Sequence, residues 1–262
     1  MPVEPGQPRR DLSWQLRQHA ASWRDAGVEW VPAASPTPRT PAAAAPGPSS
    51  ASSLFEAQER IRSSEPARAP LDIEARRQAL TVLQGHVAQC RRCPELASTR
   101  RQTVFGEGAL DAELCFIGEA PGADEDAQGR PFVGAAGQLL DRIIAACGMK
   151  REEVYICNIL RCRPPGNRLP LPNEAAHCRE FLEGTLELIR PKYICCLGAC
   201  AAQNLLNTAL SIGRLRGAFH NYRGIPVVCT YHPAYLLRNP AAKKDVWDDM
   251  KKLLARMGRP VN

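Results

Sequence analysis

The feature that most limits the fold of this chain is an alternation of short apolar runs with longer amphipathic segments. Four runs have strand length and end at turn-forming or polar residues: 114–117, 154–157, 193–197 and 225–229. Segments with the apolar spacing of helices precede, separate and follow them, at 71–88, 135–147, 173–189, 199–206 and 241–257. Such an alternation predicts a parallel sheet with helices on both faces. We therefore expect an α/β protein with three layers, α/β/α, around a central, mainly parallel four-stranded sheet.

The N-terminal part of the chain has a different composition. Residues 31–53 consist mainly of Pro, Ala, Ser and Thr, and such a segment buries too little apolar surface to offset the entropy of ordering it. The sequence predicts two regions, a low-complexity, disordered extension over residues 1–70 and a folded domain over residues 71–262. The extension is expected to be dispensable for the folded domain, with recruitment of an unknown protein as its alternative role.

Charge and cysteine content narrow the class of protein. The 262-residue chain carries 34 Lys and Arg against 27 Asp and Glu, a formal charge of +7 that permits nucleic-acid binding without requiring it. It has 11 cysteines, no secretory leader and no apolar run near the roughly 18 residues of a membrane span. We therefore expect a cytoplasmic protein without membrane contact, in which clustered cysteines indicate metal or redox chemistry rather than disulfides.

Four of the cysteines are spaced as ligands. Cys90 and Cys93 form a C-x2-C pair, and Cys162 and Cys178 bracket an irregular loop rich in Pro, Gly and Arg. Four thiolates of this kind suit either Zn2+ or a [4Fe-4S] cluster, and the neighbouring arginines would offset their charge. The other seven cysteines fall in predicted strands and helices, where we expect them to be small buried apolar residues.

The stretch from residue 113 to residue 134 predicts a ligand site. It is a strand followed by a Gly/Pro turn that leads toward a helix, which is how open α/β sheets build a site at the carboxyl edge of their strands. Glu119, Asn158 and His232 each follow a predicted strand, so they are expected to meet at that edge. Pro233 restricts the backbone of His232, Asn158 offers both a donor and an acceptor, and Phe132 offers an aromatic face. These residues predict a pocket for a heteroaromatic ring.

Three motifs and the four cysteines together resemble the family 4 uracil-DNA glycosylases, the iron–sulfur type. The motifs are GEAPGADEDAQGRPFVG at 118–134, NILRCRPPGNR at 158–168 and HPAYLLR at 232–238, and the resemblance covers residues 90–257. It implies a uracil-DNA glycosylase-like fold and a DNA-repair hydrolase. Such an enzyme cleaves the N-glycosidic bond of uracil in single- or double-stranded DNA and leaves an abasic site. It also implies that Cys90, Cys93, Cys162 and Cys178 hold a structural [4Fe-4S] cluster rather than zinc.

The resemblance also implies roles for single residues. Phe132 would stack on a uracil flipped out of the duplex, Asn158 would hydrogen-bond its pyrimidine edge, and His232 would stabilise charge on its O2 atom. Either Leu236 or Leu237 would fill the space left by the extruded nucleotide, with Arg238 near a phosphate. A monomer associated with the nucleoid is expected.

The sequence departs from the better-known glycosylases of this superfamily at two positions. Ala120 stands where they carry a water-positioning aspartate, which leaves Glu119 as the nearest carboxylate. Gly122 replaces the aromatic residue that screens the thymine methyl group, so Glu125 is the candidate for crowding C5. The loop after Cys162 has no inserted histidine of the kind that traps DNA covalently, so turnover is expected. Two alternatives remain, a non-catalytic iron–sulfur DNA-binding module and a nucleotide-binding partner protein recruited through residues 1–70.

Overall fold

The computed structural model describes residues 72–260 of the chain. The predicted extension, residues 1–70, therefore lies outside the described residues. Between residues 72 and 260, none of the helices combines the length and the apolar character needed to cross a bilayer.

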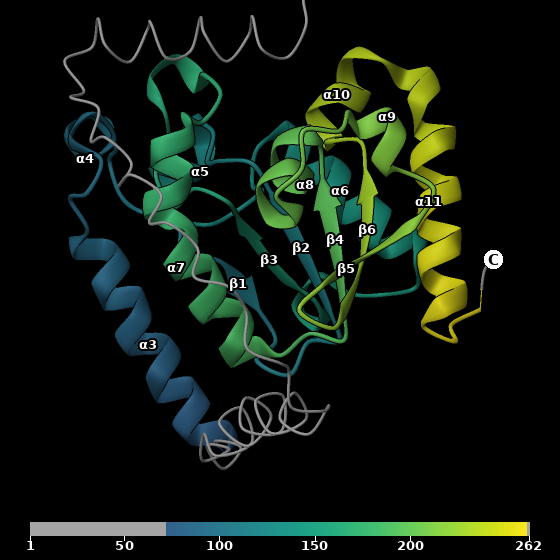
Figure 1. The fold of residues 1–262 in the computed structure, drawn as a ribbon, viewed down its shortest axis with the longest axis horizontal. Helices are drawn as coiled ribbons and strands as arrows, with labels where there is room; N and C mark the ends of the chain where they lie inside the picture. Colours follow the sequence, from purple (N-terminus) through teal and green to yellow (C-terminus); the bar gives the residue numbers. More distant parts are fainter. Residues whose placement is uncertain (1–71, 261–262) are drawn as a thin grey trace, which may run out of the picture. The chain divides into compact units, whose positions relative to one another are not determined.

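The described residues form an α/β fold around one six-stranded sheet (Figure 1). Its centre consists of four parallel strands in the order β3-β2-β4-β6, and each corresponds to one of the four predicted runs. Their bounds are Leu114–Gly118 for β2, Tyr155–Asn158 for β3, Tyr193–Leu197 for β4 and Ile225–Thr230 for β6. The parallel sheet and the α/β class are confirmed.

Two short antiparallel strands that were not predicted complete the edges of the sheet. β1 (Glu107–Gly108) pairs with β3, and β5 (Phe219–Tyr222) pairs with β6. β5 and β6 are joined by Arg223 and Gly224, which both have positive φ angles, 50° and 87°. A two-residue connection with two left-handed residues is the turn that matches the twist of a hairpin.

Nine helices cover the sheet or extend from its edges in the described part of the chain (Figure 1). Five correspond to predicted helices: α3 (Ile73–Gln89), α6 (Ala135–Ala146), α7 (Pro172–Ile189), α8 (Ala199–Leu206) and α11 (Lys243–Arg256). Four short ones were not predicted: α4 (Pro94–Thr99), α5 (Ala123–Gln128), α9 (Ile212–Leu215) and α10 (Pro233–Arg238).

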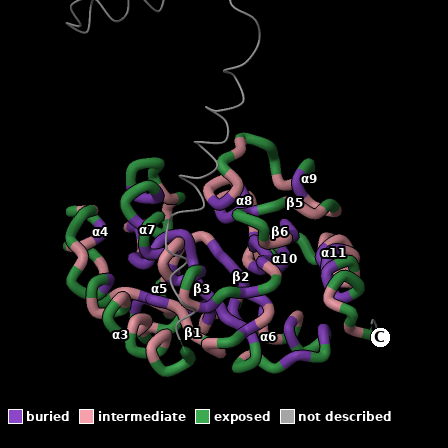
Figure 2. The backbone as a smooth tube through the Cα atoms, turned by 60° about the horizontal axis from the view of Figure 1, so that its bottom comes forward, coloured by how far each residue is buried: buried purple, intermediate pink, exposed green. Residues whose placement is uncertain are grey.

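Alternate side chains of each strand enter two separate apolar cores, because successive residues of a strand point to opposite faces. Cys115, Ile117 and Cys196 pack in the core beneath α7 and α8. Leu114 and Phe116 pack in the core beneath α6, α10 and α11. Figure 2 shows the central strands buried between helices whose outer faces are exposed. In Figure 1, α3 lies beside α7 on one side of the sheet and α11 lies on the other.

Neighbouring strands send the chain to opposite faces of the sheet. β2 leads to α6 on one face and β3 leads to α7 on the other, while β4 leads to α8 and β6 to α10 and α11. In open α/β sheets a crevice forms beyond the carboxyl ends of strands where the connections diverge in this way. The fold therefore places a crevice beside Gly118, Asn158, Gly198 and Thr230.

Candidate active site

A cavity of about 200 Å3 lies at the predicted edge of the sheet. The seven predicted catalytic and substrate-binding residues all line it: Glu119, Ala120, Gly122, Glu125, Phe132, Asn158 and His232. The loop after β3 also lines the cavity, through Pro164, Asn167 and Arg168, which were not predicted as lining residues. Residues from four separate segments thus converge on one cavity.

His232 is held so that its free nitrogen carries a proton. It caps the N-terminus of α10, and its Nδ1 accepts a hydrogen bond of 3.1 Å from the backbone N–H of Ala234. Because Nδ1 is an acceptor, the neutral ring carries its hydrogen on Nε2. Burial, with the positive charge of Arg238 as a second cause and Glu125 opposing both, lowers the pKa of His232 to about 4. At neutral pH the site therefore contains an uncharged N–H donor.

Phe132 forms an aromatic wall beside this donor. Its side chain is buried, and its ring centroid lies 5.6 Å from that of His232 with 32° between the ring planes. A Cβ atom at Gly118 would lie 2.5 Å from the phenyl ring, and one at Gly137 would lie 1.9 Å from the Phe132 carbonyl oxygen. Glycine at these two positions is therefore what allows β2 and α6 to approach Phe132 so closely.

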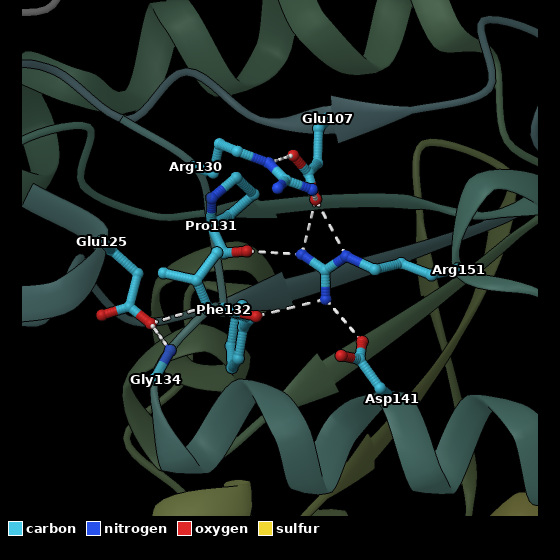
Figure 3. A network of polar contacts seen from close by, with 9 residues as sticks. Glu107, Glu125, Arg130, Pro131, Phe132, Gly134, Asp141 and Arg151 are labelled. Atoms are coloured by element: carbon cyan, nitrogen blue, oxygen red, sulfur yellow. Dashed lines mark hydrogen bonds and ion pairs between the residues drawn. The ribbon is translucent and has the colours of Figure 1, made fainter. Parts of the chain in front are cut away.

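The backbone of Phe132 is left-handed, with φ of 52°. This region disfavours residues with a side chain by about 1–2 kcal/mol. Figure 3 shows what surrounds the segment: Arg151 donates to the carbonyl oxygens of Pro131 and Phe132 at 2.5 and 3.2 Å. Contacts from the rest of the fold therefore hold this residue in a conformation that it would rarely adopt alone.

Glu125 faces the same segment from the other side. Its Oε1 accepts hydrogen bonds from the backbone N–H groups of Val133 at 2.9 Å and Gly134 at 3.0 Å, and its Oε2 accepts one from Gly122 at 3.0 Å. Glu125, which was expected to crowd C5 of the base, thus accepts hydrogen bonds from three backbone N–H groups. It lines the cavity and braces the cavity wall at the same time.

Asn158 ends β3 with an unused acceptor. Its side chain is 2% exposed, and its amide oxygen Oδ1 has no hydrogen-bond partner among the described residues. An unpaired buried polar atom costs about 1–3 kcal/mol. This cost is removed when a ligand places a donor in the cavity, as the N–H edge of a pyrimidine would.

Glu119 is a second carboxylate on the cavity wall, next to the apolar Ala120. Burial raises its pKa, and a hydrogen bond from the Cys200 thiol partly opposes that rise. The pKa of Cys200 is in turn raised to about 12 by burial and by Glu119. Cys200, in the first turn of α8, was expected only as a small packing residue, and its contact with a site carboxylate was not predicted.

The two leucines of α10 are not equivalent. Leu236 is 1% exposed and packs in the core beneath α6 and α11, whereas Leu237 is 44% exposed and Arg238 lies on the surface. Of the two residues considered for insertion into DNA, Leu236 is therefore unsuitable, because its side chain is already committed to the core. Leu169 and Leu171, on the loop after β3, are also exposed and were not predicted.

The four predicted ligand cysteines lie around one small apolar core. Cys90 ends α3, Cys93 begins α4, Cys162 follows β3 and Cys178 lies in α7. Val87, Leu96, Leu160 and Phe181 belong to the same core. The structure therefore brings together cysteines that are far apart in the sequence.

The environment of these sulfur atoms suits thiolates bound to a cationic group. Arg100 donates to Cys162 Sγ at 2.9 Å, and His177 Nδ1 lies 3.6 Å from Cys93 Sγ. Burial raises the pKa values of Cys93 and Cys162 to about 11, and the positive charge of Arg100 opposes the rise at Cys162. Among residues 72–260, no three His, Cys, Asp or Glu side chains converge as closely as the ligands of a single metal ion. The donor set nevertheless fits a larger sulfur-bound group.

Comparison with known proteins points to one family. The sequence profile of the uracil DNA glycosylase superfamily matches residues 105–251. A type-4 uracil-DNA glycosylase of Archaeoglobus fulgidus is 43% identical over 175 residues, which are 64% of this chain and 87% of the relative. One of Thermotoga maritima is 42% identical over 181 residues, 68% of this chain and 94% of the relative. A type-5 enzyme of Pyrobaculum aerophilum is 29% identical over 182 residues, 57% of this chain and 80% of the relative.

Proposed function

This chain belongs to the uracil DNA glycosylase superfamily, and on that premise we propose how its cavity excises uracil from DNA. The protein is a hydrolase of the type-4 kind that acts in the repair of uracil-containing DNA. The observation that supports the site assignment is the convergence of Phe132, Asn158 and His232 on one cavity. The bond to be cleaved is shielded within stacked DNA, so the nucleotide must leave the stack before it can enter such a cavity.

Phe132 and Asn158 select and orient the base. The buried phenyl ring supplies a flat apolar face on which uracil stacks. The free Oδ1 atom of Asn158 accepts a hydrogen bond from the N3–H group of uracil, and the amide NH2 donates to O4. Cytosine presents the opposite donors and acceptors at this edge, so it leaves the buried amide unpaired.

His232 stabilises the leaving group. As the C1′–N1 bond breaks, its electron pair passes to uracil and negative charge gathers on O2. The Nε2–H group of the neutral ring donates to that oxygen, and the enclosed cavity strengthens the interaction. We assign Glu119 to the water that attacks C1′, because it is the carboxylate of the cavity whose oxygens are not engaged by backbone N–H groups.

The cysteine site is proposed to hold a [4Fe-4S] cluster through Cys90, Cys93, Cys162 and Cys178. A cluster bound there would link the loop after β3 to α3, α4 and α7. That loop carries Pro164, Asn167 and Arg168 into the cavity wall, so the role assigned to the cluster is structural. Arg100, already bonded to Cys162 Sγ, offsets the negative charge of the bound thiolates.

DNA is proposed to bind across the mouth of the cavity in single- or double-stranded form. Leu237, exposed on α10, fills the gap that the extruded nucleotide leaves, and Arg238 contacts a neighbouring phosphate. In this proposal the protein acts as a monomer, and residues 1–70 recruit another protein.

An oligonucleotide with one labelled uracil tests the function. The wild-type chain is expected to release free uracil and leave an abasic site over many turnovers. His232→Ala and Asn158→Ala are each expected to slow release by about 100- to 1,000-fold, the usual effect of losing a donor to a developing anion. DNA binding without release of uracil by the wild-type chain would instead identify a non-catalytic binding module.

A further inference from the structure

We propose that Arg151 is a positioning residue that sets the conformation of Phe132 and hence the face on which uracil stacks. This inference rests on the proposed function, in which Phe132 is the stacking residue. Arg151 does not line the cavity, and it belongs to a 3-10 turn, η1 (Arg151–Glu153), just before β3. Its effect on the reaction must therefore pass through the residues that it holds.

Both ends of the Arg151 guanidinium group are engaged (Figure 3). Nη2 donates to the carbonyl oxygen of Pro131 at 2.5 Å and Nη1 donates to that of Phe132 at 3.2 Å. Two carboxylates fix the group itself: Glu107 Oε1 accepts from Nε and Nη2 at 2.8 and 2.6 Å, and Asp141 Oδ1 accepts from Nη1 at 2.6 Å. β1 and α6 thereby place one planar donor against two consecutive carbonyl groups.

The N–H groups of the next two residues are held from the opposite direction. Val133 and Gly134 donate to Glu125, as described above. Over residues 131–134, two carbonyl groups thus point to Arg151 and two N–H groups point to Glu125. This pattern fixes the orientation of the consecutive peptide planes on either side of Phe132, whose φ angle is positive.

A change in these peptide planes would move the phenyl ring. Gly118 and Gly137 leave no spare space next to the ring and next to the Phe132 carbonyl. If either carbonyl turned away from Arg151, the ring would have to leave its position 5.6 Å from His232. A misplacement of about 1 Å at a reacting centre is enough to cost about 100-fold in rate.

The contacts require an arginine rather than any positive charge. The five donors of the guanidinium lie in one rigid plane, and here they reach two carbonyl oxygens and two carboxylates at once. A lysine at this position keeps the charge that faces Glu107 and Asp141, but its single ammonium group cannot span both carbonyls. We call the contacts of Arg151 with the carbonyl groups of Pro131 and Phe132 the clamp. Arg151→Lys therefore separates the geometry of the clamp from its charge.

Arg76 provides a matched control. Its guanidinium also gathers backbone carbonyls, those of Leu110 at 2.5 Å, Leu188 at 2.6 Å and Ile189 at 2.8 Å. These carbonyls precede β2 and β4, at the edge of the sheet away from the cavity. Arg76→Gln should therefore remove a comparable set of bonds without affecting Phe132.

A spectroscopic experiment reports on the clamp without requiring catalysis. The six phenylalanines of the full chain are replaced by 4-fluorophenylalanine, and the 19F resonance of residue 132 is assigned from its loss in Phe132→Leu. We expect one sharp resonance in the wild type and in Arg76→Gln. In Arg151→Gln and Arg151→Lys the resonance should shift and broaden or divide. An unchanged resonance in the folded Arg151 variants would overturn the proposal.

Kinetics then connect the clamp to the reaction. Single-turnover release of uracil should fall at least 10-fold in Arg151→Gln and remain at the wild-type rate in Arg76→Gln. The double variant Arg151→Gln/Phe132→Ala should be no slower than Phe132→Ala alone, because Arg151 acts through that ring. Additive losses would overturn the proposal even if each single variant is slow. A wild type that releases no uracil, with the expected 19F shifts still present, would refute the proposed function and leave the clamp intact.

Discussion

His232 and Asn158 provide opposite kinds of polar group without carrying charge. His232 presents an N–H donor because a backbone N–H occupies its other nitrogen, and Asn158 presents a buried oxygen that has no partner among the described residues. Neither group must lose a proton or break a strong bond before uracil binds. In the proposed reaction, these polar groups are thus organised in advance for the leaving base, which is the main requirement for electrostatic stabilisation of a transition state.

The depressed pKa of His232 predicts a loss of stability in acid. The folded chain holds this ring neutral down to about pH 4, whereas the unfolded chain protonates it near its ordinary pKa of 6.5. Between these values the unfolded state binds more protons, so the free energy of unfolding falls as the pH drops from 6.5 toward 4. The contribution of this one residue approaches about 3 kcal/mol. Urea unfolding of the wild type and of His232→Gln measures it.

The wild type and His232→Gln should differ in how steeply the free energy of unfolding changes with pH, and not only in its value at one pH. His232→Gln has no titrating group at this position, so its free energy of unfolding should fall less steeply over the same pH range. Parallel curves from pH 7 to pH 4 would contradict the buried, neutral state of His232.

Sequence reasoning located the residues that follow strand ends and missed those that brace them. Glu119, Asn158 and His232 could be predicted because a parallel sheet brings all its carboxyl ends to one edge. Arg151 and Cys200 carried no comparable signal, because their partners are backbone groups and side chains distant in the sequence. Glu125 was associated with the cavity, but its three bonds to backbone N–H groups follow from the path of the chain, which composition does not reveal.

Helix α10 presents adjacent leucines to two different environments. Leu236 faces the core and Leu237 faces solvent, so substitution of each should have a distinct effect. Leu236→Ala is expected to cost about 2–5 kcal/mol of stability, the range for a buried leucine. Leu237→Ala should leave the melting temperature unchanged and slow release of uracil from duplex DNA. It should have little effect on single strands, because extrusion of a nucleotide from a single strand leaves no gap in a duplex for the side chain to fill.

Melting curves and single-turnover assays on both kinds of DNA distinguish the two roles. Equal losses on single- and double-stranded substrates in Leu237→Ala would argue against insertion of its side chain into the duplex.

The junction of α3, α4 and α7 is the second element whose role can be tested. Cys162→Ala should abolish the iron content and the brown colour expected of anaerobically purified protein. It should also increase hydrogen exchange in α4 and in the loop of residues 161–171, because both lose their common anchor. Cys195→Ala is the matched control: Cys195 is fully buried in β4 away from this junction, so its replacement should leave the iron content unchanged. Colourless wild-type protein with stoichiometric zinc would overturn the cluster assignment.

Short helices escaped prediction for a physical reason. α5 spans only Ala123–Gln128, and its sequence ADEDAQ has no apolar stripe, so it resembles an acidic loop. Glu125, three residues after Gly122, was the available signal, since a carboxylate at that position accepts from the N-terminal N–H groups of a helix. The longer helices could be predicted because their apolar faces pack in the cores of the fold.

At the level of the whole chain, the residues that line the cavity fall between Glu119 and Ala234, and the profile of the uracil DNA glycosylase superfamily matches residues 105–251. A protein consisting of residues 71–262 should therefore release uracil from naked DNA at the rate of the full chain. The rates of the two proteins on one oligonucleotide provide the measurement. A marked loss in the shorter protein would assign residues 1–70 a part in substrate binding instead of recruitment alone.

The docking of α3 along α7 has a consequence for how the protein matures in the cell. Cys90 and Cys93 precede Cys178 by more than 80 residues in the sequence, and the four sulfurs lie around one core only when α7 is docked beside α3. The proposed cluster could therefore bridge all four sulfurs only in a chain in which α7 has already docked beside α3. Delivery of the proposed cluster would accordingly require a folded surface rather than a nascent peptide.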